Sequence, residues 1–124
     1  MKKTCLLIVG LLYAAFIYAN VDTVYIFSKA MQKDIKTVVI KPSNYKKKKS
    51  SSYPVVYLLH GAMGVSTNWI RKVPQLQEMA DEHQLIIVCP DGSVNSWYFD
   101  SPVDSSYRYE THVGTEVPEY IDAN

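Results

Sequence analysis

The stretch from Tyr53 to Gly64, YPVVYLLHGAMG, limits the possible folds of this chain more than any other part of the sequence. Its apolar, strand-forming residues follow one another in a nearly continuous run, as in strands that are buried on both faces. His60-Gly61 and the second glycine, Gly64, then end the run in a sharp turn. Because sheets with two buried faces are covered by helices, this stretch predicts an α/β fold.

The turn after this strand has a composition suited to anion binding. Gly61 and Gly64 allow the backbone to turn so that its N–H groups point outward instead of into a ladder. Outward amides just past the C-terminal end of a strand can bind an anionic oxygen. A purely structural glycine turn between strand and loop explains the same residues equally well.

The rest of the chain supplies the other elements of such a fold. Two alternating segments, 21–28 and 34–41, predict an antiparallel strand pair. Segment 73–83 has the spacing of an amphipathic helix and leads into an apolar strand at 85–89, which predicts a strand–helix–strand unit with parallel strands. A last helix is expected from about residue 109 to 124. Its apolar residues at helical spacing are Val113, Val117, Tyr120 and Ile121.

The first 19 residues resemble a secretory signal peptide. Lys2 and Lys3 precede an apolar run that ends at Ala19, after which cleavage is expected. The chain therefore divides into a signal peptide at 1–19 and one further domain at 20–124, with a secreted or periplasmic location expected. An uncleaved N-terminal anchor is the alternative, although the run is short for a full span. Cys5 lies too early in it for a lipoprotein, so no stable membrane anchor is expected after cleavage.

Charge and cysteine content exclude several classes of protein. Lys2 and Lys3 are the only charged residues of the first 19, which leaves 11 basic against 12 acidic residues in the remainder. No nucleic-acid partner is therefore expected. The basic run 46–49 lies among serines and predicts a solvated loop, with a polyanion-binding patch as the alternative. Cys89 is the one cysteine left, so we expect a buried core residue and no internal disulfide.

Several segments together resemble one esterase family. These are YLLHGAMG with Asn68-Trp69 after it, ADEHQ, LIIVCPDG, NSWYFDSP and YETHVGTEVPEYID. They resemble the N-terminal part of the α/β-hydrolase family that includes S-formylglutathione hydrolases, feruloyl and acetylxylan esterases and mycolyltransferases. The resemblance implies that 20–124 is a partial esterase-like domain with the N-terminal part of an α/β-hydrolase sheet. In that part, an antiparallel strand pair leads into parallel strands with a crossover helix, and the chain is truncated before the nucleophile elbow.

The resemblance also implies roles for six residues. The backbone N–H of Ala62 would be one of two oxyanion-hole donors, with His60 and Gly61 supporting its turn. The loop 95–100 would lie beside the substrate cleft. There the substrate-binding candidates are Trp97, Tyr98 and Asp100. The aromatic rings could stack on a sugar or an aromatic acyl group. The alternative is that these rings only cover the edge of the sheet. Asp100 is expected to bond local backbone.

The catalytic nucleophile of this family is absent. The G-x-S-x-G elbow does not occur in the 124 residues, and the nearest segment, 64–68, has Asn68 in place of its last glycine. A rearranged triad would have to draw on residues with better local explanations. Those residues are Ser66, Ser93 and Ser96; His60, His83 and His112; Asp91 and Asp100. No pair of histidines has the spacing of zinc ligands on one element, so no metal and no cofactor are expected.

Two hypotheses of function follow. The first is the N-terminal portion of a secreted serine carboxylic-ester hydrolase that acts on acyl or feruloyl esters of carbohydrates and is inactive as this fragment. Its partner would be a small-molecule or carbohydrate ester. The second is a non-catalytic relic or interaction module with an esterase-like half-sheet.

Overall fold

The computed structural model describes residues 20–47 and 52–124. The expected signal peptide at 1–19, and Lys48 and Lys49 of the basic run, lie outside these residues. In the part that is described, no helix combines the length and the apolar character needed to cross a membrane.

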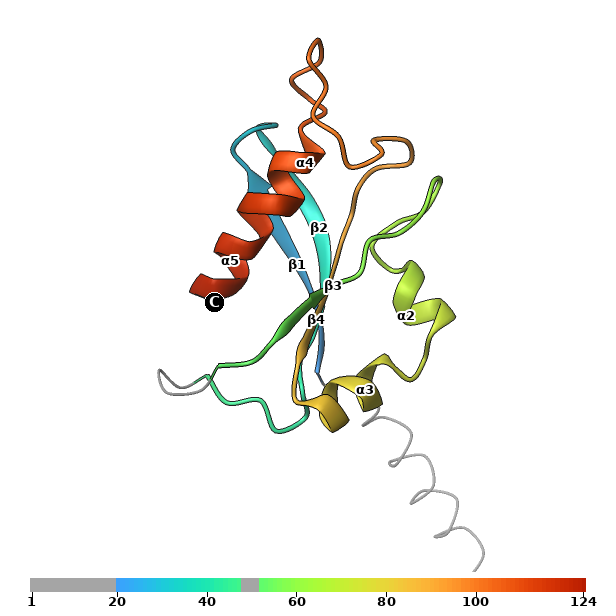
Figure 1. Cartoon of the computed structure of the whole chain (residues 1–124), viewed down its shortest axis with the longest axis vertical. Helices are drawn as coiled ribbons and strands as arrows, with labels where there is room; N and C mark the ends of the chain where they lie inside the picture. Colours follow the sequence, from blue (N-terminus) through green and yellow to red (C-terminus); the bar gives the residue numbers. More distant parts are fainter. Residues whose placement is uncertain (1–19, 48–51) are drawn as a thin grey trace, which may run out of the picture.

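The described residues form a four-stranded mixed sheet in the order β1-β2-β4-β3 (Figure 1). The strands are β1 (Val21–Ser28), β2 (Lys33–Ile40), β3 (Val55–Tyr57) and β4 (Ile86–Pro90). β1 pairs with β2 and β2 with β4 in antiparallel fashion, whereas β3 and β4 are parallel. The expected antiparallel pair leading into parallel strands is thus confirmed.

Two short helices make the crossover from β3 to β4, where the sequence predicts one. These are α2 (Asn68–Lys72) and α3 (Leu76–His83). Val73 separates them in a non-helical conformation, with φ −128° and ψ 81°, because the proline at position 74 disfavours the helical region for the residue before it. At its other end, α3 stops at Gln84, which adopts a left-handed conformation with φ 49°.

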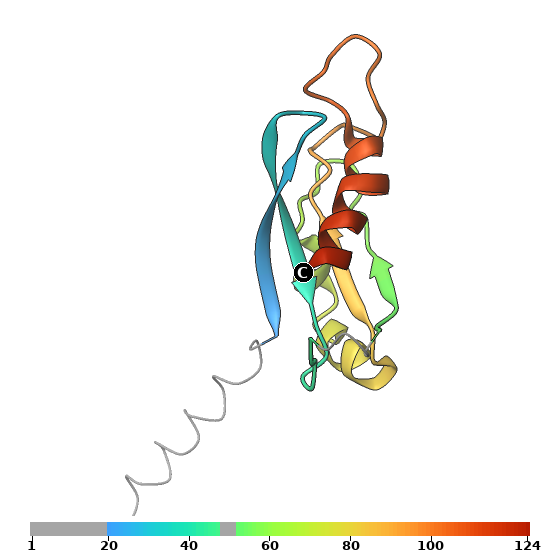
Figure 2. The ribbon, with the colours of Figure 1, turned by 90° about the vertical axis from the view of Figure 1, so that its left-hand side faces the viewer.

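Alternating side chains of β2 and β4 build a core on each face of the sheet. On one face, β2 and β4 residues pack against α3 and the residues before it: Val38, Ile40, Ile87 and Cys89 with Leu76 and Ala80. On the other, Val39, Ile86 and Val88 pack against Val117 of α5 (Val117–Ala123), the helix that lies along the sheet in Figure 2. Cys89 is fully buried, as expected of a core residue.

β3 is shorter and more exposed than the sequence predicts. It covers three residues and lies at the end of the sheet, and Val56 keeps 39% of its surface exposed. The expectation of burial on both faces is wrong for β3, the strand for which it was made, whereas the five residues of its neighbour β4 are all buried. The apolar run 55–59 indicates a strand, yet its composition does not reveal that this strand lies at the edge.

The last helix is interrupted by a π-helical turn. α4 (Tyr109–Thr111) continues into η2 (His112–Glu116) and then into α5. Pro118 in the first turn of α5 has no N–H to donate to a carbonyl one turn back, and its ring clashes with that carbonyl in regular α-helix. A wider turn before it relieves this conflict.

Candidate functional site

The loops that follow β3 and β4 meet at one end of the sheet (Figure 1). This is expected, because parallel strands place their C-terminal ends at the same edge. The two loops line a pocket of about 170 Å³. The first contributes His60, Gly61 and Ala62, and the second contributes residues 93–98. Five of the six site residues predicted from the sequence therefore line one pocket, and Asp100 is outside its lining.

His60 is buried and both of its ring nitrogens contact backbone. Nε2 accepts a hydrogen bond from the N–H of Gly92 at 2.9 Å, so the ring proton lies on Nδ1 and is donated to the carbonyl oxygen of Gly61 at 2.8 Å. This is the neutral tautomer, and it joins the two loops. The contacts are those that a bracing role for His60 requires.

The conformation of the turn differs from the sequence-based explanation. No glycine of the described residues has a positive φ, and the left-handed residue of the turn is Met63, with φ 60°. Gly64 is needed for space: a Cβ there would lie 2.7 Å from Nδ1 of His60 and 2.9 Å from the carbonyl oxygen of Gly61. At Gly61 a Cβ would meet nothing within 4 Å.

The backbone N–H of Ala62 has no acceptor among residues 20–47 and 52–124, and Ala62 is exposed. Its neighbours are anchored: the N–H of Met63 donates to the carbonyl of Val94 at 2.8 Å, and that of Gly64 to Gly61 at 3.1 Å. An exposed, unpaired amide held between anchored neighbours at the mouth of a pocket has the geometry of an anion donor.

The aromatic loop presents two neighbouring rings in different ways. Trp97 is 83% exposed, whereas Tyr98 is half-buried and its hydroxyl contacts the backbone of His60. Both residues have left-handed backbones, with φ 56° and 53°. Burial raises the pKa of Tyr98 to about 12, so its hydroxyl keeps its proton at neutral pH. Strained backbone of this kind concentrates at functional sites.

Asp91 ties the same two loops together. Its carboxylate accepts hydrogen bonds from the N–H of Ser66 at 3.1 Å and of Ser93 at 2.9 Å, and one oxygen lies 3.9 Å from Nε2 of His60. Asp91, a candidate acid for a rearranged triad, is occupied by these backbone contacts. In the sequence, Pro90-Asp91-Gly92 directly after a strand indicates a turn, and an aspartate in a turn commonly bonds nearby backbone.

The other candidates for a rearranged triad have contacts that do not form one. His83 is exposed at the end of α3, and His112 is fully buried with Nδ1 2.7 Å from Glu116. Asp100 accepts hydrogen bonds from the backbone and hydroxyl of Thr111. Within the described ranges no serine hydroxyl is hydrogen-bonded to a histidine ring. The same residues hold no cluster of three metal-ligating side chains.

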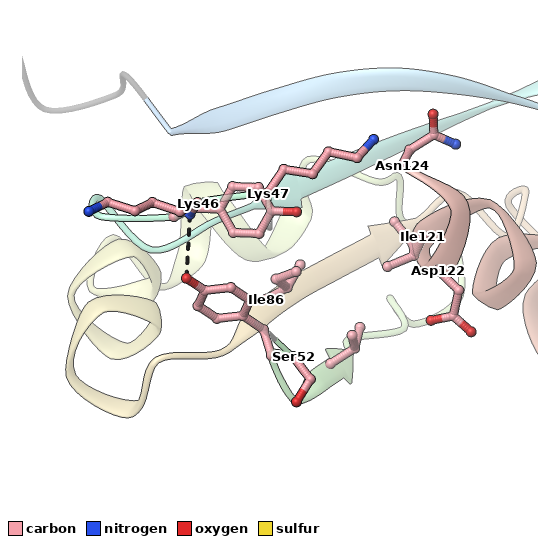
Figure 3. A pocket seen from close by; sticks show the side chains of 10 residues that line it. Lys46, Lys47, Ser52, Ile86, Ile121, Asp122 and Asn124 are labelled. Carbon is pink, nitrogen blue, oxygen red and sulfur yellow. Dashed lines mark hydrogen bonds between the residues drawn. The ribbon is translucent and has the colours of Figure 1, made fainter. Parts of the chain in front are cut away.

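A larger cleft, of about 620 Å³, lies at the opposite end of β3 and β4 (Figure 3). Lys46, Lys47 and Ser52 line it from the loop before β3, and Ile121, Asp122 and Asn124 from the C-terminal helix. It is remote from the strand ends that carry His60 and Asp91. The predicted site residues do not contribute to it.

Comparison with known proteins places these features in context. The family model described as "Esterase: Putative esterase" matches residues 28–124. S-formylglutathione hydrolase of Rattus norvegicus is 30% identical over 95 residues, covering 60% of this chain and 33% of that protein. The chain thus spans about one third of the length of the curated relatives it matches.

Solved structures resemble the fold over most of the chain. A ferulic acid esterase has a TM-score of 0.67 and 30% identity, covering 83% of this chain and 43% of that one. An S-formylglutathione hydrolase from Agrobacterium tumefaciens has a TM-score of 0.68 at 22% identity, covering 82% and 43%.

Proposed function

Since this chain belongs, by its match over residues 28–124, to the esterase family of the α/β-hydrolases, we propose that it is the N-terminal portion of a serine carboxylic-ester hydrolase. The observation that carries the proposal is the free N–H of Ala62 at the mouth of the pocket that both strand-end loops line. The alternative, a non-catalytic relic or interaction module, is favoured by the absence of G-x-S-x-G from the 124 residues.

In the proposed reaction, a serine supplied by the rest of the protein attacks the ester carbonyl. The tetrahedral intermediate places negative charge on the former carbonyl oxygen, and the N–H of Ala62 donates to it together with a second amide. One such donor lowers the barrier by roughly 3 kcal/mol. His60 and Gly61 hold the turn, and neither ring nitrogen of His60 is free to serve as the base.

The substrate proposed is an acyl or feruloyl ester of a carbohydrate. Two features support this class: the ring of Trp97 is free to stack on a planar group, and a ferulic acid esterase is among the solved structures most similar to the chain. We further propose export through the signal peptide at 1–19, which fits a substrate outside the cell.

The proposal is tested first by extending the chain. We expect the reading frame after the Asn124 codon to continue and to encode G-x-S-x-G, and the extended protein to hydrolyse p-nitrophenyl acetate and methyl ferulate. The 124-residue chain alone should show no turnover above an unrelated protein with three histidines, because an oxyanion donor without an activated nucleophile cannot start the attack. A stop codon directly after Asn124 would favour the interaction module.

Two substitutions in the extended enzyme separate the backbone role of Ala62 from its side chain. Ala62→Gly keeps the N–H and should be mild, whereas Ala62→Pro removes it and should lower kcat by about a hundredfold or more. Equal rates for the two variants would contradict the oxyanion role. Turnover by the 124-residue chain that Ser66→Ala, Ser93→Ala or Ser96→Ala abolishes would instead establish a rearranged triad.

A further inference from the structure

We propose that Tyr98 is a positioning residue whose hydroxyl fixes the turn that carries the Ala62 amide. The catalytic role of that amide rests on the proposed function, whereas the contact made by Tyr98 rests on geometry alone. Tyr98 was expected to bind substrate through its ring. The structure shows its hydroxyl accepting a hydrogen bond from the N–H of His60 at 3.0 Å and lying 3.1 Å from the carbonyl oxygen of His60, to which it donates.

The need for this contact arises from the way the parallel ladder ends. The N–H of Leu58 still donates to the carbonyl of Val88 at 2.9 Å. Two residues further along β4 stands Pro90, which has no N–H to continue the ladder. In the register of this ladder, the donor that Pro90 lacks is the one for the carbonyl of Leu58, so the ladder ends there. The next amide in register, that of Gly92, donates to Nε2 of His60 instead of to its carbonyl. The hydroxyl of Tyr98 then satisfies both the N–H and the C=O of His60. A buried backbone group without a partner would be costly.

The surrounding residues hold Tyr98 in the required position. A Cβ on Gly92 would overlap Cε1 of Tyr98, so the ring packs directly on the glycine backbone. The hydroxyl of Ser96 accepts a hydrogen bond from the N–H of Tyr98 at 3.1 Å and donates to the carbonyl of Gly92. These contacts stabilise the left-handed backbone at Tyr98, which would otherwise be strained.

The position of Ala62 follows from two anchors. Before it, His60 is held by Tyr98. After it, Met63 is held by the carbonyl of Val94 at 2.8 Å. The unpaired N–H of Ala62 is thus fixed in direction by two contacts to the loop after β4, while the exposed ring of Trp97 is left to meet a substrate. Preorganised donors of this kind need no rearrangement when charge develops.

The test is amide hydrogen exchange, followed by NMR, in the full 124-residue chain and its Tyr98→Phe variant. We expect exchange at His60 and Met63 to accelerate about tenfold, because the phenyl ring keeps the packing and loses both hydrogen bonds. Exchange at core amides such as Val38 and Val88 should stay within about twofold of the parent chain. Tyr107→Phe is the matched control, since no hydrogen bond of the Tyr107 hydroxyl occurs in the described part of the chain.

If Tyr98 only stabilised the whole fold, Tyr98→Phe would accelerate exchange at core and turn amides alike, and that result would overturn the proposal. Unchanged exchange at His60 and Met63 would overturn it as well. Should Tyr98→Phe not fold, Ser96→Ala decides by the same comparison, because it loosens the Tyr98 backbone and keeps the ring. The exchange measurement does not depend on hydrolysis. If exchange at His60 and Met63 accelerates in Tyr98→Phe but the extended protein is inactive, the positioning contact is upheld and the esterase function is rejected.

Discussion

At the scale of single residues, the site depends on side chains that replace missing strand contacts. His60, Asp91 and Tyr98 each bond backbone groups of the loop opposite their own. The supporting role of His60 was expected, but the contact of Tyr98 could not be predicted, because nothing local in Asn95-Ser96-Trp97-Tyr98 indicates that the tyrosine hydroxyl meets position 60. The pattern HGAMG did predict the turn and its exposed amide, although Met63, and no glycine, has the left-handed conformation.

The close packing at Gly92 gives a residue-scale prediction. Gly92→Ala should destabilise the protein by about 1–3 kcal/mol, because the added methyl overlaps the Tyr98 ring. Gly61→Ala is the control: its Cβ meets nothing within 4 Å, and the change should stay within about 0.5 kcal/mol. Denaturant unfolding of both variants measures the difference. Equal losses would mean that the Tyr98 ring does not lie against Gly92.

At the scale of elements, the C-terminal helix is joined to the β1–β2 hairpin by one carboxylate. Glu116 accepts hydrogen bonds from the N–H of Ala30 at 2.9 Å and from Nδ1 of His112 at 2.7 Å. Burial raises the pKa of Glu116, but hydrogen bonds from Ser28, Ala30 and His112 outweigh it and hold the pKa below the usual 4.5. The carboxylate form is thus favoured by folding.

The direction of this pKa shift determines how the stability of the protein depends on pH. Because the pKa is lower in the folded state, the contribution of Glu116 is complete above the unfolded value of 4.5 and is lost as the pH falls through the folded value. The free energy of unfolding should therefore decline below pH 4.5 less steeply in Glu116→Gln than in the parent chain. Glu119→Gln, on the exposed face of α5, is the control and should follow the parent.

The elements themselves were largely predictable where periodicity was strong. The strands at 21–28, 33–40 and 86–90 agree with those expected to within one residue at each end. The helix expected over 73–83 ends at His83 as expected but begins only at Leu76. Two features were missed. Val73-Pro74 divides the crossover into two helices, and the conflict at Pro118 inserts a π-helical turn into a segment whose apolar spacing indicates one continuous helix.

At the scale of the whole molecule, the order β1-β2-β4-β3 could not be derived from residue patterns alone. The resemblance to α/β-hydrolases implied an antiparallel pair leading into parallel strands, and the structure adds the order, with β3 at the end of the described sheet. The faces, by contrast, follow from alternation: successive residues of β2 and β4 point to the α3 side and to the α5 side in turn. Composition specifies which residues are buried better than which strands are neighbours.

The side-chain bonds between the two strand-end loops also set an order of events in folding. The β1–β2 hairpin closes over the four residues 29–32, whereas the bonds of Ser66, Gly92 and His60 to the other loop span 25, 32 and 38 residues. Closing a longer loop costs more chain entropy, so the hairpin can form early and the pocket only after β3 and β4 have paired. Pulse-labelled hydrogen exchange during refolding should protect Val24 and Thr37, which face each other in the hairpin, before His60 and Met63. Simultaneous protection would show instead that the pocket belongs to the folding nucleus.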